Sequence, residues 1–254
     1  MAYLTSRVHS PQGFHPTFTT SIHSPLQLLV SGHNLTSSCT LHLLYTLPPG
    51  IFVDRHELAL RHNQYTFIHW GSRDLERPVG AVEASEVLIS VPEPGGVELE
   101  KDDGQGEVEV RVEVPMHLRY GRPRKKDQVE GREERERGGK PYQEICVDWP
   151  MAFLSCPRCS DTDCLSSQVT PPSPTTIPLH VLSSLTNQST HTLIPINPHP
   201  SFNVTFNHRN HTCIALLLPV GDASDLALVE ILTTLTMLAC FFKRKLTERL
   251  RVYD

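Results

Sequence analysis

The feature that most constrains this chain is an apolar run near its C-terminal end. Between Leu226 and Phe242 the polar interruptions are one acid, Glu230, and three threonines, Thr233, Thr234 and Thr236. As a helix this run would extend roughly 25 Å, which fits a reticulum bilayer of about 27 Å better than a plasma membrane of about 32 Å. We therefore predict a transmembrane helix over residues 226–242. The alternative, which draws on Glu230 and the threonines, is a buried amphipathic helix of a soluble domain.

The charges on either side of the run predict its orientation. Asp222 and Asp225 precede it, whereas five basic residues follow it: Lys243, Arg244, Lys245, Arg249 and Arg251. Under the positive-inside rule, residues 243–254 form a basic cytosolic tail and the residues before 225 lie in the lumen. A removable lipid-anchor signal is excluded, because such a signal ends in its apolar segment and this chain continues with polar residues.

Glycosylation motifs agree with a lumenal N-terminal part. Four of the seven asparagines begin an Asn-x-Ser/Thr motif, namely Asn34, Asn187, Asn203 and Asn210, and we predict glycosylation there. A lumenal domain normally follows a signal peptide, yet residues 1–32 contain no apolar core of the usual length. We expect an upstream segment before the present start. The alternative is that the C-terminal helix directs insertion by itself.

Alternating apolar and polar residues dominate the chain before the apolar run. This period of two predicts half-buried strands at 39–45, 64–70, 82–91, 107–114, 144–149, 179–185, 191–196 and 213–220. We predict a mainly β, antiparallel sandwich-like lumenal domain over residues 1–220, with no long helix before Leu226. A charged loop at 121–140 and a Pro/Ser/Thr-rich linker at 166–178 interrupt it, and residues 97–107 resemble a hairpin turn.

Six cysteines precede the apolar run, and an oxidising lumen would pair them as disulfides in one of about 15 ways. They are Cys39, Cys146, Cys156, Cys159, Cys164 and Cys213, while Cys240 lies inside the run. The Cys156–Cys159 spacing also matches a redox motif. Because no helix or βαβ unit is predicted beside it, structural disulfides are favoured over redox chemistry or zinc binding.

The sequence offers little catalytic chemistry. Asp161 and Asp163 form an Asp-x-Asp motif of the kind with which glycosyltransferases hold a divalent metal, but no nucleotide-binding unit surrounds it. The P-loop, dinucleotide, nucleophile-elbow and zincin motifs are absent from the sequence. A net charge of −5 gives no reason to expect nucleic acid. We predict a non-catalytic protein without metal or cofactor. Glu230, an acid within the span, either contacts a partner helix or extends to the membrane surface.

Four sequence blocks, in order, resemble the PIG-X family. They are "LPPGIFVDRHELAL" (47–60), "VEVPMHLRYGRPR" (112–124), "PYQEICVDWPMAFLSC" (141–156) and "LLLPVGDASDLALVEILTTLTML" (216–238). The resemblance implies a single-span endoplasmic reticulum protein that stabilises glycosylphosphatidylinositol mannosyltransferase I. Its multi-spanning PIG-M-type partner would add the first mannose in anchor biosynthesis. The family supplies no catalytic residue to transfer. A lumenal chaperone, or a glycosyltransferase-like protein using Asp161 and Asp163, is the alternative.

The blocks also suggest which residues contact the partner. The matching positions are Pro49, Gly50, Phe52, Asp54, Glu57, Leu58, His117, Leu118, Arg119 and Tyr120. From these and the span we select Asp54, Glu57, His117, Arg119, Tyr120 and Glu230 as partner-binding candidates. Pro48-Pro49-Gly50 predicts a turn that begins an extended segment with an exposed edge. Arg119 and Tyr120 could anchor an interface, although an ordinary strand ending at Gly121 explains them equally well.

Overall fold

The structure is a computed structural model that describes residues 2–9, 13–25, 39–92, 100–101, 107–124, 142–157, 177–185, 191–199, 205–206, 209–210, 213–223 and 225–251. The chain divides into two compact units. The first comprises residues 1–119 and 144–218, and the second comprises residues 120–143 and 219–254. Each unit is described by itself.

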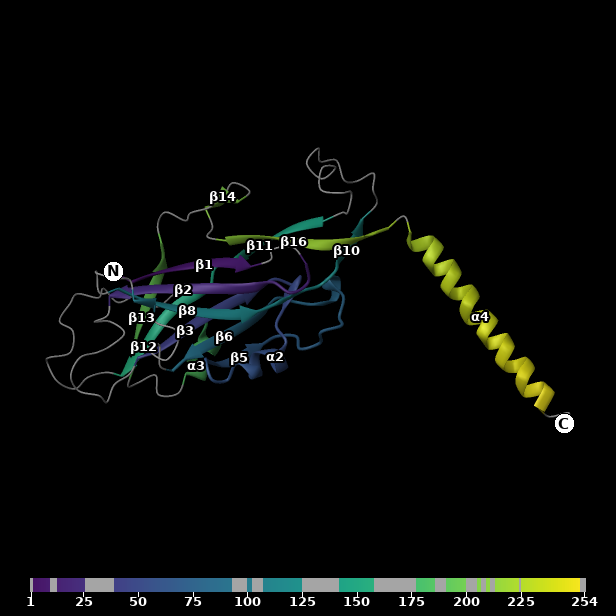
Figure 1. Ribbon diagram of the computed structural model, residues 1–254, viewed down its shortest axis with the longest axis horizontal. Coiled ribbons are helices and arrows are strands. Elements are labelled where there is room, and N and C mark those ends of the chain that lie inside the picture. The colour runs from purple at the N-terminus through teal and green to yellow at the C-terminus, as the bar shows by residue number, and fades with distance from the viewer. Residues whose placement is uncertain are drawn as a thin grey trace. The chain divides into compact units, whose positions relative to one another are not determined.

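A nine-stranded sheet forms most of the first unit (Figure 1). In spatial order its strands are β5 (Thr66–Trp70), β6 (Ser85–Val91), β3 (Thr40–Leu47), β12 (Met151–Pro157), β13 (His191–Pro198), β1 (Tyr3–His9), β2 (Thr17–Pro25), β8 (Glu107–Pro115) and β7 (Glu100–Lys101). Neighbours in this sheet are antiparallel except β1 and β13, which are parallel. This one parallel pair joins strands from opposite ends of the chain, which supplies the long connection that parallel pairing requires.

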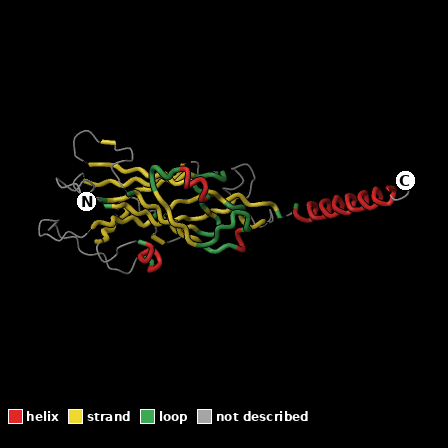
Figure 2. Tube along the Cα trace, turned by 90° about the horizontal axis from the view of Figure 1, so that it is seen from below, coloured by secondary structure: helices red, strands yellow, loops and turns green. Residues whose placement is uncertain are grey.

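The sheet curls so that its two halves share one apolar core. Thr20 of β2 and Tyr45 of β3 are separated by three strands in the sheet, yet their hydroxyl oxygens lie 2.8 Å apart in a hydrogen bond. Alternate residues of each half point into the core, for example Phe18 and Ile22 from β2 facing Leu43 from β3. Strands far outnumber helices in this unit (Figure 2). The prediction of a mainly β, sandwich-like domain is confirmed.

A second, smaller apolar cluster covers the outer face of β3, β6 and β12. Leu44, Leu88 and Phe153 from these strands pack with Val181 of helix α3 (Leu179–Ser184). The prediction of a strand at 179–185 is therefore wrong. Val181 lies within the helix and Leu185 directly follows it, and both pack against the sheet.

Smaller strands complete the fold. The pair β4 (Ile51–Phe52) and β9 (His117–Leu118) is antiparallel, as is the pair β14 (Thr205–Phe206) and β15 (Arg209–Asn210). Strand β16 (Cys213–Asp222) lies between β11 (Tyr142–Asp148) and β10 (Gly121–Arg124). β10 thus occupies the first residues of the predicted charged loop, and residues 125–140 lie outside the described part of the chain.

Several strands were not predicted. β1, β2 and β12 fell in segments that were considered only for a signal peptide or for the family blocks, although "TFTTSIHSP" of β2 alternates in the usual way. Of the predicted linker 166–178, the structure describes Ile177, which packs against the outer cluster, and Pro178, which precedes α3. The domain boundaries at 1–220, 226–242 and 243–254 stay predictions.

Two disulfides connect distant parts of the first unit. Cys39, just before β3, is bonded to Cys156 of β12, and Cys146 of β11 is bonded to Cys213 at the start of β16. Cys156 therefore does not pair with Cys159 as a redox motif would require. Cys159 and Cys164 lie outside the described residues. The bonds close loops of 117 and 67 residues, so each is expected to stabilise the fold by roughly 2–4 kcal/mol.

The second unit contains a long helix, α4 (Leu226–Arg251). Its residues Leu226–Lys245 are long and apolar enough to cross a membrane, with a mean hydropathy of 1.8, and their side chains are exposed. The helix continues past the predicted span into the basic residues of the tail. The three threonine hydroxyls donate to carbonyl oxygens four residues earlier in the same helix, at 2.7–2.8 Å. These hydroxyl groups therefore need no further hydrogen-bond partner in an apolar environment.

The disulfide pairing can be tested by serine replacement in the full chain. Cys39→Ser and Cys146→Ser should each lower the unfolding free energy by roughly 2–4 kcal/mol. Cys39→Ser combined with Cys156→Ser should lower the unfolding free energy no more than either change alone, because only one bond is lost. The losses from Cys39→Ser and Cys146→Ser should instead add, because two bonds are lost. Cys240→Ser, at the free cysteine, is the control. Additivity within the first pair, measured by chemical denaturation, would contradict the pairing.

His42 should make stability depend on pH. It is 5% exposed on β3, its Nδ1 lies 2.8 Å from Ser90 Oγ, and burial lowers its pKa to about 4. Between about pH 6.5 and pH 4 the unfolded chain takes up a proton at His42 that the folded chain does not. Unfolding free energy should therefore fall as pH falls through this window, by at most about 3 kcal/mol from this residue.

The measurement is denaturation of the full chain at several pH values. His42→Gln should reduce the slope between pH 4 and 6.5, while His62→Gln, at an exposed position, should leave it unchanged. Equal slopes in wild type and His42→Gln would show that this histidine is not the group responsible.

Candidate functional site

The first family block folds as a turn, a short strand and a helix. The amide of Ile51 donates to the carbonyl oxygen of Pro48 at 2.9 Å, which confirms the predicted Pro-Pro-Gly turn. A Cβ at Gly50 would lie 3.2 Å from the Leu218 side chain, so this position favours glycine. β4 then pairs with β9, which lies inside the second block, so that Ile51 pairs with Leu118 and Phe52 with His117.

Helix α2 (Arg55–Leu60) replaces the predicted strand end. The Asp54 carboxylate accepts a hydrogen bond from the His56 amide at 2.8 Å, which caps the helix, and Leu58 is fully buried beneath it. An aspartate directly before "RHELAL" is a signal for the start of a helix. This signal was overlooked because the mixed charges of the segment also fit an exposed strand.

Four side chains from the two blocks form a connected group, the β4–α2–β9 cluster: Phe52, Glu57, His117 and Arg119. The His117 Nε2 and Glu57 Oε2 atoms lie 2.7 Å apart, and the His117 and Phe52 rings stack with centroids 5.1 Å apart. The Arg119 guanidinium lies 4.6 Å from the Phe52 ring centre, in a cation–π contact. Three of these, Glu57, His117 and Arg119, were selected from the sequence as partner-binding candidates.

Arg119 is the most constrained member of the cluster. It is 6% exposed, and its guanidinium donates to the carbonyl oxygens of Asp74, Leu75 and Arg77 at 2.7–2.8 Å. Burial lowers its pKa, and the Asp74 carboxylate opposes that shift. In the structure Arg119 therefore holds the segment after β5 in place. Tyr120, which belongs to the second unit, is 66% exposed and presents a large ring at the surface.

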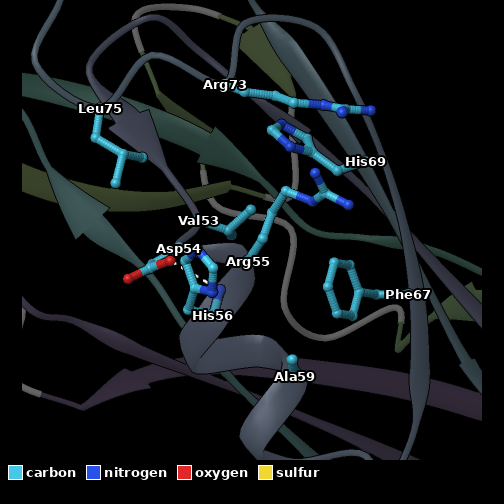
Figure 3. Close-up of a pocket in the computed structure, with 9 residues that line it drawn as sticks. All are labelled: Val53, Asp54, Arg55, His56, Ala59, Phe67, His69, Arg73 and Leu75. Carbon is cyan, nitrogen blue, oxygen red and sulfur yellow. Dashed lines mark hydrogen bonds between the residues drawn. The ribbon is translucent and has the colours of Figure 1, made fainter.

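A cavity of about 400 Å³ lies beside the first turn of α2 (Figure 3). Arg55 and His56 from α2, Phe67 and His69 from β5, and Arg73 and Leu75 from the following segment contribute to its lining. Gly71, with φ of +104°, ends β5, and a Cβ there would lie 2.8 Å from the Ser85 Cβ. This glycine lets the chain turn from β5 toward the cavity wall.

His69 is the unusual group in the cavity. It is 8% exposed, and both of its ring nitrogens lack a hydrogen-bond partner. Burial, then the positive charges of Arg73 and Arg55, lower its pKa. Sequence reasoning missed this group. The signal was present, because the alternation of Tyr65, Phe67 and His69 places a histidine on the apolar face of a predicted strand.

The remaining predicted sites are only partly described. Within the described residues, no group of three or more His, Cys, Asp or Glu side chains is arranged to hold a metal. Asp161 and Asp163 lie outside those residues, as do Asn34, Asn187 and Asn203, while the backbone of Asn210 belongs to β15. Glu230 is exposed on α4. The partner-binding role of the six candidates stays a prediction.

The fold and the site define the class of protein: a curled, disulfide-linked β domain followed by one helix able to cross a membrane. A family model described as PIG-X / PBN1 matches residues 11–243, which include the β domain except β1 and most of the candidate span. The chain belongs to the PIG-X/PBN1 family.

Curated relatives agree with this assignment. Protein pbn1 of Aspergillus oryzae is 31% identical over 157 residues, which is 58% of this chain and 25% of the relative. Protein PBN1 of Gibberella zeae is 33% identical over 165 residues, 60% of this chain and 27% of the relative. Protein pbn1 of Emericella nidulans is 30% identical over 156 residues, which is 58% of this chain and 26% of the relative. The chain thus aligns with about a quarter of the length of these relatives.

The structural role of Arg119 predicts a large cost for a conservative change. Arg119→Lys should lower the unfolding free energy by roughly 2–4 kcal/mol, because one ammonium group cannot reach three carbonyl oxygens in the fork geometry of a guanidinium. Arg77→Lys is the matched control, since Arg77 forms an exposed ion pair with Asp74 and should change stability by less than about 0.5 kcal/mol. Thermal and chemical denaturation would measure both. Equal effects would contradict the proposed role.

Proposed function

We propose that this chain acts in glycosylphosphatidylinositol-anchor biosynthesis, the role that membership of the PIG-X/PBN1 family implies. Within that role we propose a non-catalytic stabilising subunit of mannosyltransferase I, whose PIG-M-type catalytic subunit adds the first mannose. The observation that carries the proposal is the match of residues 11–243 to the family model, since it includes the β domain and the helix together.

The proposed location is the endoplasmic reticulum membrane, with the β domain in the lumen and the basic tail in the cytosol. Two disulfides between distant strands support an oxidising compartment. The acidic residues before α4 and the basic residues after Phe242 support the same orientation.

Stabilisation requires only preferential binding. A subunit that binds the folded enzyme, and not its unfolded form, shifts the folding equilibrium by mass action. Two candidates suit this contact because they are exposed: Tyr120, with its large ring, and Glu230, the only charged residue in the apolar part of the span. The β4–α2–β9 cluster would support the contact made in the lumen, because its side chains already bind one another and keep this part of the β domain rigid.

Deleting the gene in its own host tests the function. The level of the PIG-M-type enzyme and first-mannose transfer by isolated membranes would be measured together, and the enzyme would then be overexpressed. We expect both to fall by severalfold and overexpression to restore transfer at least in part. An enzyme that stays abundant while transfer is lost would contradict a stabilising role and would make Asp161 and Asp163 the residues to replace first. Association with many unrelated clients would instead indicate a general chaperone.

Complementation then localises the contact. Tyr120→Ala and Glu230→Gln should each lower enzyme abundance while this chain itself accumulates normally. Leu179→Ala, at a leucine of α3 that is also exposed, is the control and should complement fully.

A further inference from the structure

The cavity beside α2 concentrates positive charge around a buried histidine. Figure 3 shows the Arg55 and Arg73 side chains on either side of the His69 ring. Within the described part of the chain, neither guanidinium forms a hydrogen bond or an ion pair, and both His69 nitrogens are unpartnered. Asp54 is the one acidic residue of the lining, and its carboxylate caps α2. The cavity therefore presents three nitrogen groups with unfilled hydrogen-bonding capacity.

We propose that this cavity binds a phosphate group, either as a free phosphate or as the headgroup of a lipid. A guanidinium donates two parallel hydrogen bonds to an oxyanion, and two guanidiniums with an imidazole form a set of three separate donors. A phosphate monoester presents three terminal oxygens, one for each of these groups, whereas a carboxylate would have to share its two oxygens among them. The volume of about 400 Å³ lies in the range of small-ligand sites.

The walls of the cavity suit the organic part of a phosphate ester. Val53, Phe67 and Leu75 form apolar lining next to the arginines. The contact of Arg119 with the Leu75 carbonyl fixes the segment that carries Arg73 and Leu75, so the lining is held in place before a ligand arrives.

Binding should be coupled to protonation of His69. The charged or titratable residues that line the cavity with it are Arg55 and His56 from α2, Asp54 just before α2 and Arg73 from the segment after β5, and β6 presents Val87 opposite it in the sheet. Burial and the two arginines lower the His69 pKa in the empty cavity. A bound phosphate would offset the arginine charges and accept a hydrogen bond from a protonated His69 nitrogen, so the His69 pKa should rise on binding.

The test uses the full chain in detergent micelles and two probes, inorganic phosphate and dioctanoyl phosphatidic acid, with chloride at equal ionic strength as the reference. NMR of the histidine side chains, with His69 assigned by His69→Gln, would follow each titration. We expect saturable shifts of the His69 signals and an upward shift of its pKa. Saturation by phosphate indicates a free-phosphate site, and saturation by the lipid alone indicates a headgroup site.

Substitutions locate the site. Arg55→Gln and Arg73→Gln should each weaken binding about tenfold or more, because each removes charge-assisted hydrogen bonds. Both residues are exposed, so the ligand-free variants should unfold at the wild-type temperature. Arg7→Gln, an exposed arginine on β1 outside the cavity, is the control for net charge.

The proposal is overturned if neither probe shifts the His69 signals, or if Arg7→Gln weakens binding as much as the cavity variants do. It is independent of the stabilising function proposed above, because it is measured on the isolated chain. Binding of phosphate by a chain whose deletion leaves the enzyme abundant would separate the two.

Discussion

The hydrogen bond between Thr20 and Tyr45 marks the constraint on which the rest of the domain depends. The two residues are far apart in the order of strands, so the bond can form only where the sheet has curled until β2 lies over β3. Burial raises the pKa of Tyr45, and its hydroxyl would be an unsatisfied polar group in an apolar core without this partner. Ser6 extends the contact, with its hydroxyl 3.2 Å from that of Thr20. This closed core holds β8 in position, and the C-terminal end of β8 leads directly into β9 and Arg119.

The β4–α2–β9 cluster depends on that closure. β9 follows β8 at the edge of the curled sheet, and β4 follows β3 in the other half, so Phe52 and His117 meet because the two halves face each other. The amides of Met116 and Leu118 donate to Pro16 and Phe14 at 2.9 Å, which ties β9 to the segment before β2 as well. The cluster is thus supported by three distant parts of the chain, and the partner contact proposed for it would rest on the same packing as the core.

Period-two patterns predicted β5, β8 and β13, and they predicted β3 and β6 as well, although the second apolar cluster also covers the outer face of those two strands. The same rule failed at Leu179–Ser184, where a short apolar segment fits a helix as well as a strand and only the sheet beneath Val181 decides between them. The blocks of family resemblance located Glu57, His117 and Arg119, but sequence could not show that Arg119 turns inward to bind three carbonyls. His69 escaped notice because its significance depends on two arginines: Arg55, which reaches it from α2, and Arg73, which follows the turn at Gly71.

Arg119 links the cluster to the cavity. Its guanidinium touches Phe52 on one side and holds the carbonyl of Leu75 on the other, while Leu75 also lines the cavity next to Arg73. A displacement of Phe52 or His117 by a bound partner would therefore move the segment that shapes the cavity, because a buried guanidinium cannot release its carbonyls without leaving its charge unpaired. The proposed partner surface and the proposed phosphate site would therefore share Arg119 and its three hydrogen bonds as a common structural element.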